Sequence, residues 1–128
     1  MKKNAFTLIE LLAILVILTI LSIILIPTIK KAINDAKDSA YKDQVSTIKR
    51  AAEAYFVNSN FRVDSTNPKV MYLADIVSSG YIEGNKAVNP VTSETMMGCV
   101  LIKYYSNQYH YDYIDSNTEC EKYQNIRE

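Results

Sequence analysis

The first part of the chain is a nearly unbroken run of apolar residues. The run extends from Phe6 to Pro27, and its one charged side chain is that of Glu10. No charge occurs from Leu11 to Ile29, and roughly 18 apolar residues are enough to cross the hydrocarbon core of a bilayer. The run therefore predicts a helix that is hydrophobic on all sides and needs lipid or other helices around it.

A second helical pattern follows, from Thr28 to about Asn58. Its apolar and small residues recur mostly every three or four positions, as on one face of an α-helix. Pro27 is the one helix breaker before Asn58, and it lacks the backbone donor that would bond to the carbonyl of Ile23. We therefore expect a single long helix with a kink or a loosened turn before Pro27. The apolar and small positions are Ile29, Ile33, Ala36, Ala40, Tyr41, Val45, Ile48, Ala52, Tyr55 and Phe56.

The rest of the chain contains strand patterns. Cys99–Tyr105 and Tyr109–Ile114 are rich in β-branched and aromatic residues, and they predict a hairpin closed at Ser106–Gln108. Ala87–Thr92 is a candidate third strand. The pattern thus indicates a small antiparallel sheet.

Shorter elements complete this part of the sequence. Met71–Ser79 predicts a short helix, with Gly80 in the position that often ends one. Polar and turn-forming residues predict loops at Ser59–Val70 and Gly84–Pro90, and an irregular tail from Asp115.

These patterns predict the fold class α+β, with a long amino-terminal helix packed on a small antiparallel head. The helix divides into a transmembrane half, residues 6–29, and an amphipathic half, residues 30–59. The head comprises residues 60–128, which is close to the lower size limit for a stable independent core.

The sequence contains no catalytic signature. It has one histidine, His110, and none of the glycine loops or metal-binding helices that mark common enzyme classes. Acidic and basic side chains are equal in number, at 14 each, so a strong electrostatic attraction to nucleic acid is not indicated. We therefore expect a structural protein with no cofactor, and a structural role for His110.

A motif surrounds Glu10. The residues Lys2-Lys3-Asn4-Ala5-Phe6-Thr7-Leu8-Ile9-Glu10-Leu11-Leu12 resemble the class III signal sequence of type IV pilins and of the pseudopilins of related machines, and Pro27 extends the match. The resemblance implies cleavage between Ala5 and Phe6, methylation of the new amino terminus, and retention of Glu10. One departure is Ala5, because the family usually has glycine before the cleaved bond. Residues 1–5 would then be a removed leader peptide.

The resemblance also implies partners and location. Before assembly the protein would be a single-pass protein of the cell membrane, processed by a prepilin peptidase. It would then polymerise with itself into an extracellular filament, with the help of an inner-membrane assembly platform and minor pilins. In that family the Glu at position 10 meets the free amino terminus of a neighbouring subunit, so Glu10 and Pro27 are expected to act in filament assembly.

More than one function fits such a subunit. A surface pilus for adhesion or motility is the leading interpretation. A pseudopilin of a competence machine for DNA uptake, or of type II secretion, is the alternative, and a generic single-pass anchored domain is a third. The tyrosines of the hairpin could bind DNA bases or a surface ligand, or they could pack against the helix through Tyr41 or Tyr55.

Two further groups of residues in the head could form a cross-link or a metal site. Cys99 and Cys120 would form a disulfide in an exported domain, or remain free thiols in a reducing compartment. The two cysteines and the single histidine, His110, together lack the ligand spacing of a tetrahedral metal site. Four oxygen-bearing residues near the end of the hairpin are candidates for binding calcium. The alternative is that they form an acidic edge of the sheet that is exposed to solvent. These residues are Asp112, Asp115, Asn117 and Glu119.

Overall fold

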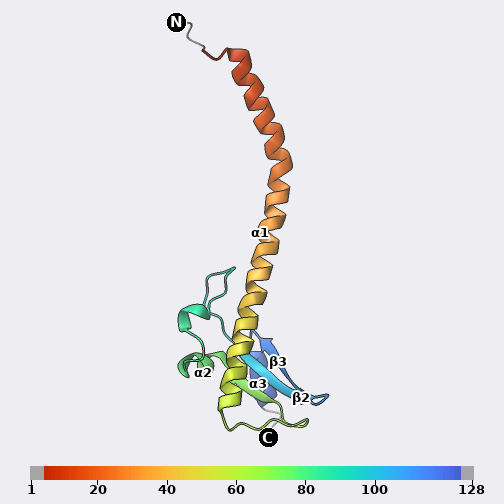
Figure 1. The fold of residues 1–128 in the computed structure, drawn as a ribbon, viewed down its shortest axis with the longest axis vertical. Helices are drawn as coiled ribbons and strands as arrows, with labels where there is room; N and C mark the ends of the chain where they lie inside the picture. Colours follow the sequence, from red (N-terminus) through yellow and green to blue (C-terminus); the bar gives the residue numbers. More distant parts are fainter. Residues whose placement is uncertain (1–4, 125–128) are drawn as a thin grey trace. The chain divides into compact units, whose positions relative to one another are not determined.

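The computed structural model describes residues 5–124 and divides into two compact units, Met1–Lys37 and Asp38–Glu128. Its long helix, three strands and shorter helices confirm the predicted α+β class, as in type IV pilins (Figure 1). The elements are α1 (Leu8–Asn58), β1 (Lys69–Tyr72), α2 (Leu73–Ser78), the 3₁₀ turn η1 (Gly84–Lys86), β2 (Cys99–Tyr105), β3 (Gln108–Ile114) and α3 (Asn117–Gln124).

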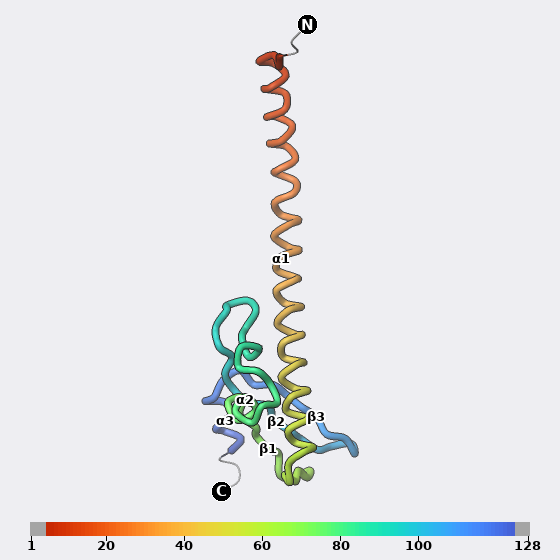
Figure 2. Tube along the Cα trace, turned by 60° about the vertical axis from the view of Figure 1, so that its left-hand side comes forward, coloured from red at the N-terminus to blue at the C-terminus, as the bar shows by residue number. Residues whose placement is uncertain are grey.

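Helix α1 continues through Pro27 without interruption (Figure 2). Proline provides no backbone N–H, so the carbonyl of Ile23 lacks its usual helical donor. Hydroxyl groups near this position donate to carbonyls one turn earlier: Ser22 Oγ to Leu18 at 2.7 Å, and Thr28 Oγ1 to Ile24 at 3.4 Å. Such bonds let polar side chains remain satisfied within an apolar helix.

The sheet is antiparallel, with the order β1-β2-β3. The hairpin between β2 and β3 turns at Ser106 and Asn107, whose φ angles are 52° and 62°. Two successive residues with positive φ are characteristic of a type I′ turn, which matches the twist of the flanking strands. The predicted hairpin is therefore present, with Gln108 in strand β3 and not in the turn.

Three expectations for the head were wrong. The third strand is β1, whose first two residues were expected in the loop Ser59–Val70 and whose last two were expected in the short helix Met71–Ser79; that helix, α2, begins at Leu73. Ala87–Thr92 forms no strand; the segment contributes one isolated bridge, Val88 to Thr95, and an Asn89 side-chain turn that accepts from the N–H of Val91 at 2.8 Å. The tail from Asp115 is not irregular, because Asn117–Gln124 forms helix α3.

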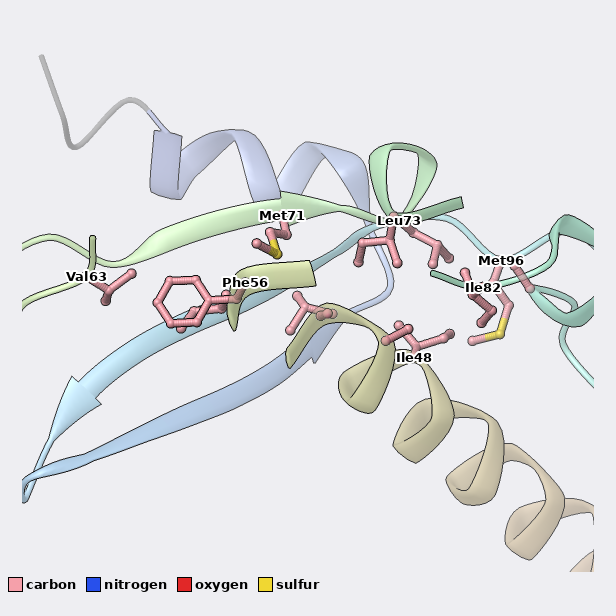
Figure 3. Packing of buried hydrophobic residues seen from close by; sticks show 13 residues of the cluster. Ile48, Phe56, Val63, Met71, Leu73, Ile82 and Met96 are labelled. Atoms are coloured by element: carbon pink, nitrogen blue, oxygen red, sulfur yellow. The ribbon is translucent and has the colours of Figure 1, made fainter. Parts of the chain in front are cut away.

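The core of the second unit lies between α1 and one face of the sheet (Figure 3). Ile48, Ala52 and Phe56 of α1 are buried, as are Val100 and Ile102 of β2. Alternation along a strand places Val100 and Ile102 on the same face, and burial of an aliphatic side chain of this size contributes about 1.5–3 kcal/mol.

The tyrosines of β3 lie on the same face of the sheet. Tyr111 and Tyr113 are half-buried against the core, and the ring of Tyr109 lies 5.2 Å from that of Phe56. The expectation that these tyrosines pack against the helix is therefore confirmed. The contact was expected through Tyr41 or Tyr55, but the α1 ring next to Tyr109 is that of Phe56. Tyr109 remains 47% exposed.

Gly98 joins several elements at the start of β2. Its N–H donates to Asn117 Oδ1 at 2.9 Å, and its carbonyl accepts from the N–H of Leu73 at 3.0 Å. Its φ is 103°, and a Cβ at this position would lie 1.9 Å from the carbonyl oxygen of Ile114. A larger residue would therefore require the backbone to move.

Candidate functional site

The first turn of α1 contains a reciprocal cap between Thr7 and Glu10. Glu10 Oε2 accepts from the N–H of Thr7 at 3.2 Å, and Thr7 Oγ1 accepts from the N–H of Glu10 at 3.3 Å. This is a capping box, which satisfies two backbone donors that a helix start would otherwise leave unpaired. The carboxylate is also favourable at this end of the helix dipole. Thr7 was not singled out from the sequence, although the T-x-x-E spacing was the signal for it.

Glu10 forms no ion pair with any residue from 5 to 124. The ion pairs in this part of the chain are Lys86–Glu83 at 3.4 Å and Lys103–Asp112 at 3.6 Å, both on the surface of the second unit. The cap provides hydrogen bonds but no opposite charge. The carboxylate is thus available to a cation from outside the described chain.

The apolar side chains that follow Glu10 are uncovered. Ile23 is 68% exposed, and none of the most apolar 18-residue window of α1 is buried. By length and composition this helix could cross a membrane. A surface this apolar is a site for lipid or for other helices.

Ala5 and Phe6 lie just before the helix, at the edge of the described residues. Phe6 is 81% exposed and precedes the first residue of α1, so the bond between Ala5 and Phe6 lies outside regular secondary structure. Residues 1–4, which carry the rest of the expected leader, lie outside the part of the chain that the structure describes.

Cys99 and Cys120 are joined by a disulfide, with the two Cα atoms 6.2 Å apart. It attaches α3 to the face of the sheet opposite α1, because Cys99 alternates with Val100 along β2. The phenol of Tyr72 adds a second contact, donating to Gln124 Oε1 at 3.1 Å. The cross-link closes a sequence separation of 21 residues, which the chain-entropy model values at about 3 kcal/mol.

The calcium candidates are not arranged as a ligand cage. Asp112 pairs with Lys103, and Asn117 Oδ1 accepts from the N–H of Gly98. Asp115 and Glu119 lie on the exposed surface. Within residues 5–124, no three His, Cys, Asp or Glu side chains form a group that could hold a metal ion.

The remaining polar residues of the hairpin have packing roles. The ring of His110 stacks on that of Tyr105, with centroids 3.7 Å apart. The phenol of Tyr113 donates to the carbonyl of Met97, and burial raises the pKa of Tyr113 to about 12. No arrangement of nucleophile, base and oxyanion donors is present among these described groups.

Comparison with known proteins identifies the amino-terminal segment. The family model for the prokaryotic N-terminal methylation motif matches residues 1–26. No curated protein and no solved structure shows significant similarity to the chain. The motif and the fold point to a structural protein, and the motif implies self-assembly, processing by a prepilin peptidase and membrane anchoring before assembly. Residues 1–26 of this α+β protein are therefore the class III signal that characterises type IV pilins.

Proposed function

We propose that the protein is the structural subunit of a type IV pilus-like extracellular filament that serves adhesion or motility. The observation that carries this proposal is Glu10, a carboxylate with no opposite charge paired to it among residues 5–124, at the start of an exposed apolar helix. Moving such a charge into lipid costs about 2.5 kcal/mol or more. A membrane anchor has no use for the charged carboxylate. A filament subunit can use it to pair with a charge on a neighbouring subunit.

Processing would create a charged partner for Glu10, which has none among residues 5–124. Cleavage between Ala5 and Phe6 would leave a positively charged amino group on Phe6. In an apolar filament core, this amine and a carboxylate are each unfavourable alone, and pairing them offsets much of the cost. The pair can form only when the amine of the neighbouring subunit reaches Glu10. Pairing would therefore stabilise the correct axial position of that subunit relative to the others.

The residues already described fit such a cycle. The apolar half of α1 would hold the subunit in the membrane and then bundle with other copies. The disulfide of the head suits an oxidising exterior. The processing enzyme, the assembly platform and the minor pilins would be the partners of this route.

Filament imaging tests the proposal. Filaments sheared from the native host should contain this protein as their main component, and deletion of its gene should abolish them and impair surface adhesion or motility. Loss of DNA uptake or of protein secretion, with surface filaments unchanged, would instead indicate a pseudopilin. Unchanged filaments, uptake and secretion would contradict both roles.

A further inference from the structure

A groove with apolar walls opens on the head. One cavity of about 610 Å³ lies beside α2, with Leu73, Val77 and Met97 among its lining residues. A second, of about 380 Å³, lies beside the start of α3. Thr95, Met96, Met97 and Asn117 line both cavities, so the two are adjacent, and we name them together the Met97 groove.

The Met97 groove is acidic and its central side chain is uncovered. Its lining includes Asp75, Glu94 and Asp115, and none of the described lining residues is Lys, Arg or His. These three carboxylates form no ion pair within residues 5–124. Met97 is 59% exposed, and an exposed methionine adapts to a partner of varied shape. The groove therefore suits a segment that presents an apolar side chain between cations.

One segment of this chain has that chemistry. Lys30, Ile33 and Lys37 follow one another at spacings of three and four on α1, so they share one face of the helix. Ile33 is 48% exposed, and the neighbouring Ile29 is 51% exposed. Neither lysine forms an ion pair within the described chain. This face is basic at both ends and apolar at its centre, which is the complement of the groove.

We propose that the Met97 groove binds the Lys30–Ile33–Lys37 face of a second copy of this chain. In this arrangement Ile33 contacts Met97, while the two lysines lie near Glu94, Asp115 and Asp75. The inference rests on the proposed function, because this contact requires copies of the chain to assemble with one another. The contact is heterologous, and heterologous contacts build open helical polymers, whereas a self-complementary patch closes a dimer.

Charge reversal tests the contact in cells. Lys30→Glu with Lys37→Glu should reduce assembled protein about tenfold or more, since like charges in an interface are strongly unfavourable. Glu94→Lys with Asp115→Lys should do the same, and combining all four changes should restore assembly. The matched control is Lys31→Glu with Lys42→Glu. This variant changes the net charge by the same amount. At about 100° per residue, Lys31 and Lys42 lie on the side of the helix opposite Ile33, so assembly should persist.

A photo-crosslink identifies the occupant directly. Replacing Met97 with p-benzoylphenylalanine in the full chain should give a covalent dimer in filaments, with the crosslinked peptide mapping to residues 28–41. Crosslinking to another protein or to another segment would overturn the inference, as would full assembly of the charge-reversed variants. In both cases wild-type filaments still form and the proposed function stands. Absence of wild-type protein from filaments would overturn the proposed function, and this inference with it.

Discussion

Thr7 and Glu10 satisfy each other's backbone donors within a single chain, at 3.2 and 3.3 Å. Glu10 thus has two separable roles. It completes the start of α1 through hydrogen bonds, and it offers a negative charge that nothing in residues 5–124 neutralises. A substitution that preserves one role and removes the other can tell which of them assembly requires.

Glu10→Gln separates the two roles. Glutamine can still complete a capping box through its amide oxygen, but it carries no charge. We expect this variant to enter the membrane normally and to form few or no filaments, as Glu10→Ala should also do. Membrane fractionation and filament counts measure the two effects. Normal filaments from Glu10→Gln, with loss in Glu10→Ala, would show that the cap and not the charge is what assembly needs.

Gly98→Ala should destabilise the head severely. The new Cβ would lie 1.9 Å from the carbonyl oxygen of Ile114, at a φ of 103°, and we expect a loss of about 3 kcal/mol or more. Gly80→Ala is the matched control, because Gly80 also has a positive φ, 81°, but has no atom within 4 Å of its Cβ position. Its cost should be about 1–2 kcal/mol. Denaturant unfolding of the full chain in detergent compares them; equal losses would contradict the packing of Gly98 against β3.

The disulfide should be present in the mature protein and should stabilise the head by about 3 kcal/mol. Alkylation of surface protein should label Cys99 and Cys120 after reduction and neither before it. Reduction should then lower the denaturant midpoint of the head. Full labelling without a reductant would argue against both the cross-link and an exported head.

The sequence was sufficient for elements whose signals are local. The apolar run and the spacing of Ile48, Ala52 and Phe56 predicted α1, and the β-branched and aromatic residues predicted β2 and β3. Each of these segments is long enough for its periodicity to be read without knowledge of its partners. The amino-terminal motif is also local, so the candidate processing site could be predicted from residues 1–12 alone.

The missed elements depend on distant partners. Strand β1 has four residues after Pro68, and it becomes a strand by pairing with β2, with Met71 opposite Val100. Helix α3 is polar, and its buried residue is Cys120, held against the sheet by the disulfide. Ala87–Thr92 has strand-like residues, but Pro90 cannot donate to a ladder. For β1 and α3, tertiary context overrides local preference, whereas at Ala87–Thr92 a local residue, Pro90, opposes the strand.

Pro27 should allow α1 to extend in the filament. The residues from Thr19 to Ile26 are rich in β-branched isoleucine, which is a weaker helix former than leucine or alanine, and Pro27 removes one hydrogen bond. We expect this stretch to kink or partly unwind once lipid is replaced by looser filament packing, although it is continuous in the single subunit. A filament reconstruction with unbroken helical bonding from Thr19 through Ile26 would show this expectation to be wrong.

The most direct measurement is the mass of the amino-terminal peptide of the protein isolated from the surface of its native host. The account predicts a chain that begins at N-methylated Phe6, with residues 1–5 removed and Glu10 as the fifth residue. We expect the processing enzyme to accept Ala5 because its side chain is small. Surface protein that still begins at Met1, or that is cut elsewhere, would contradict the account of a processed filament subunit.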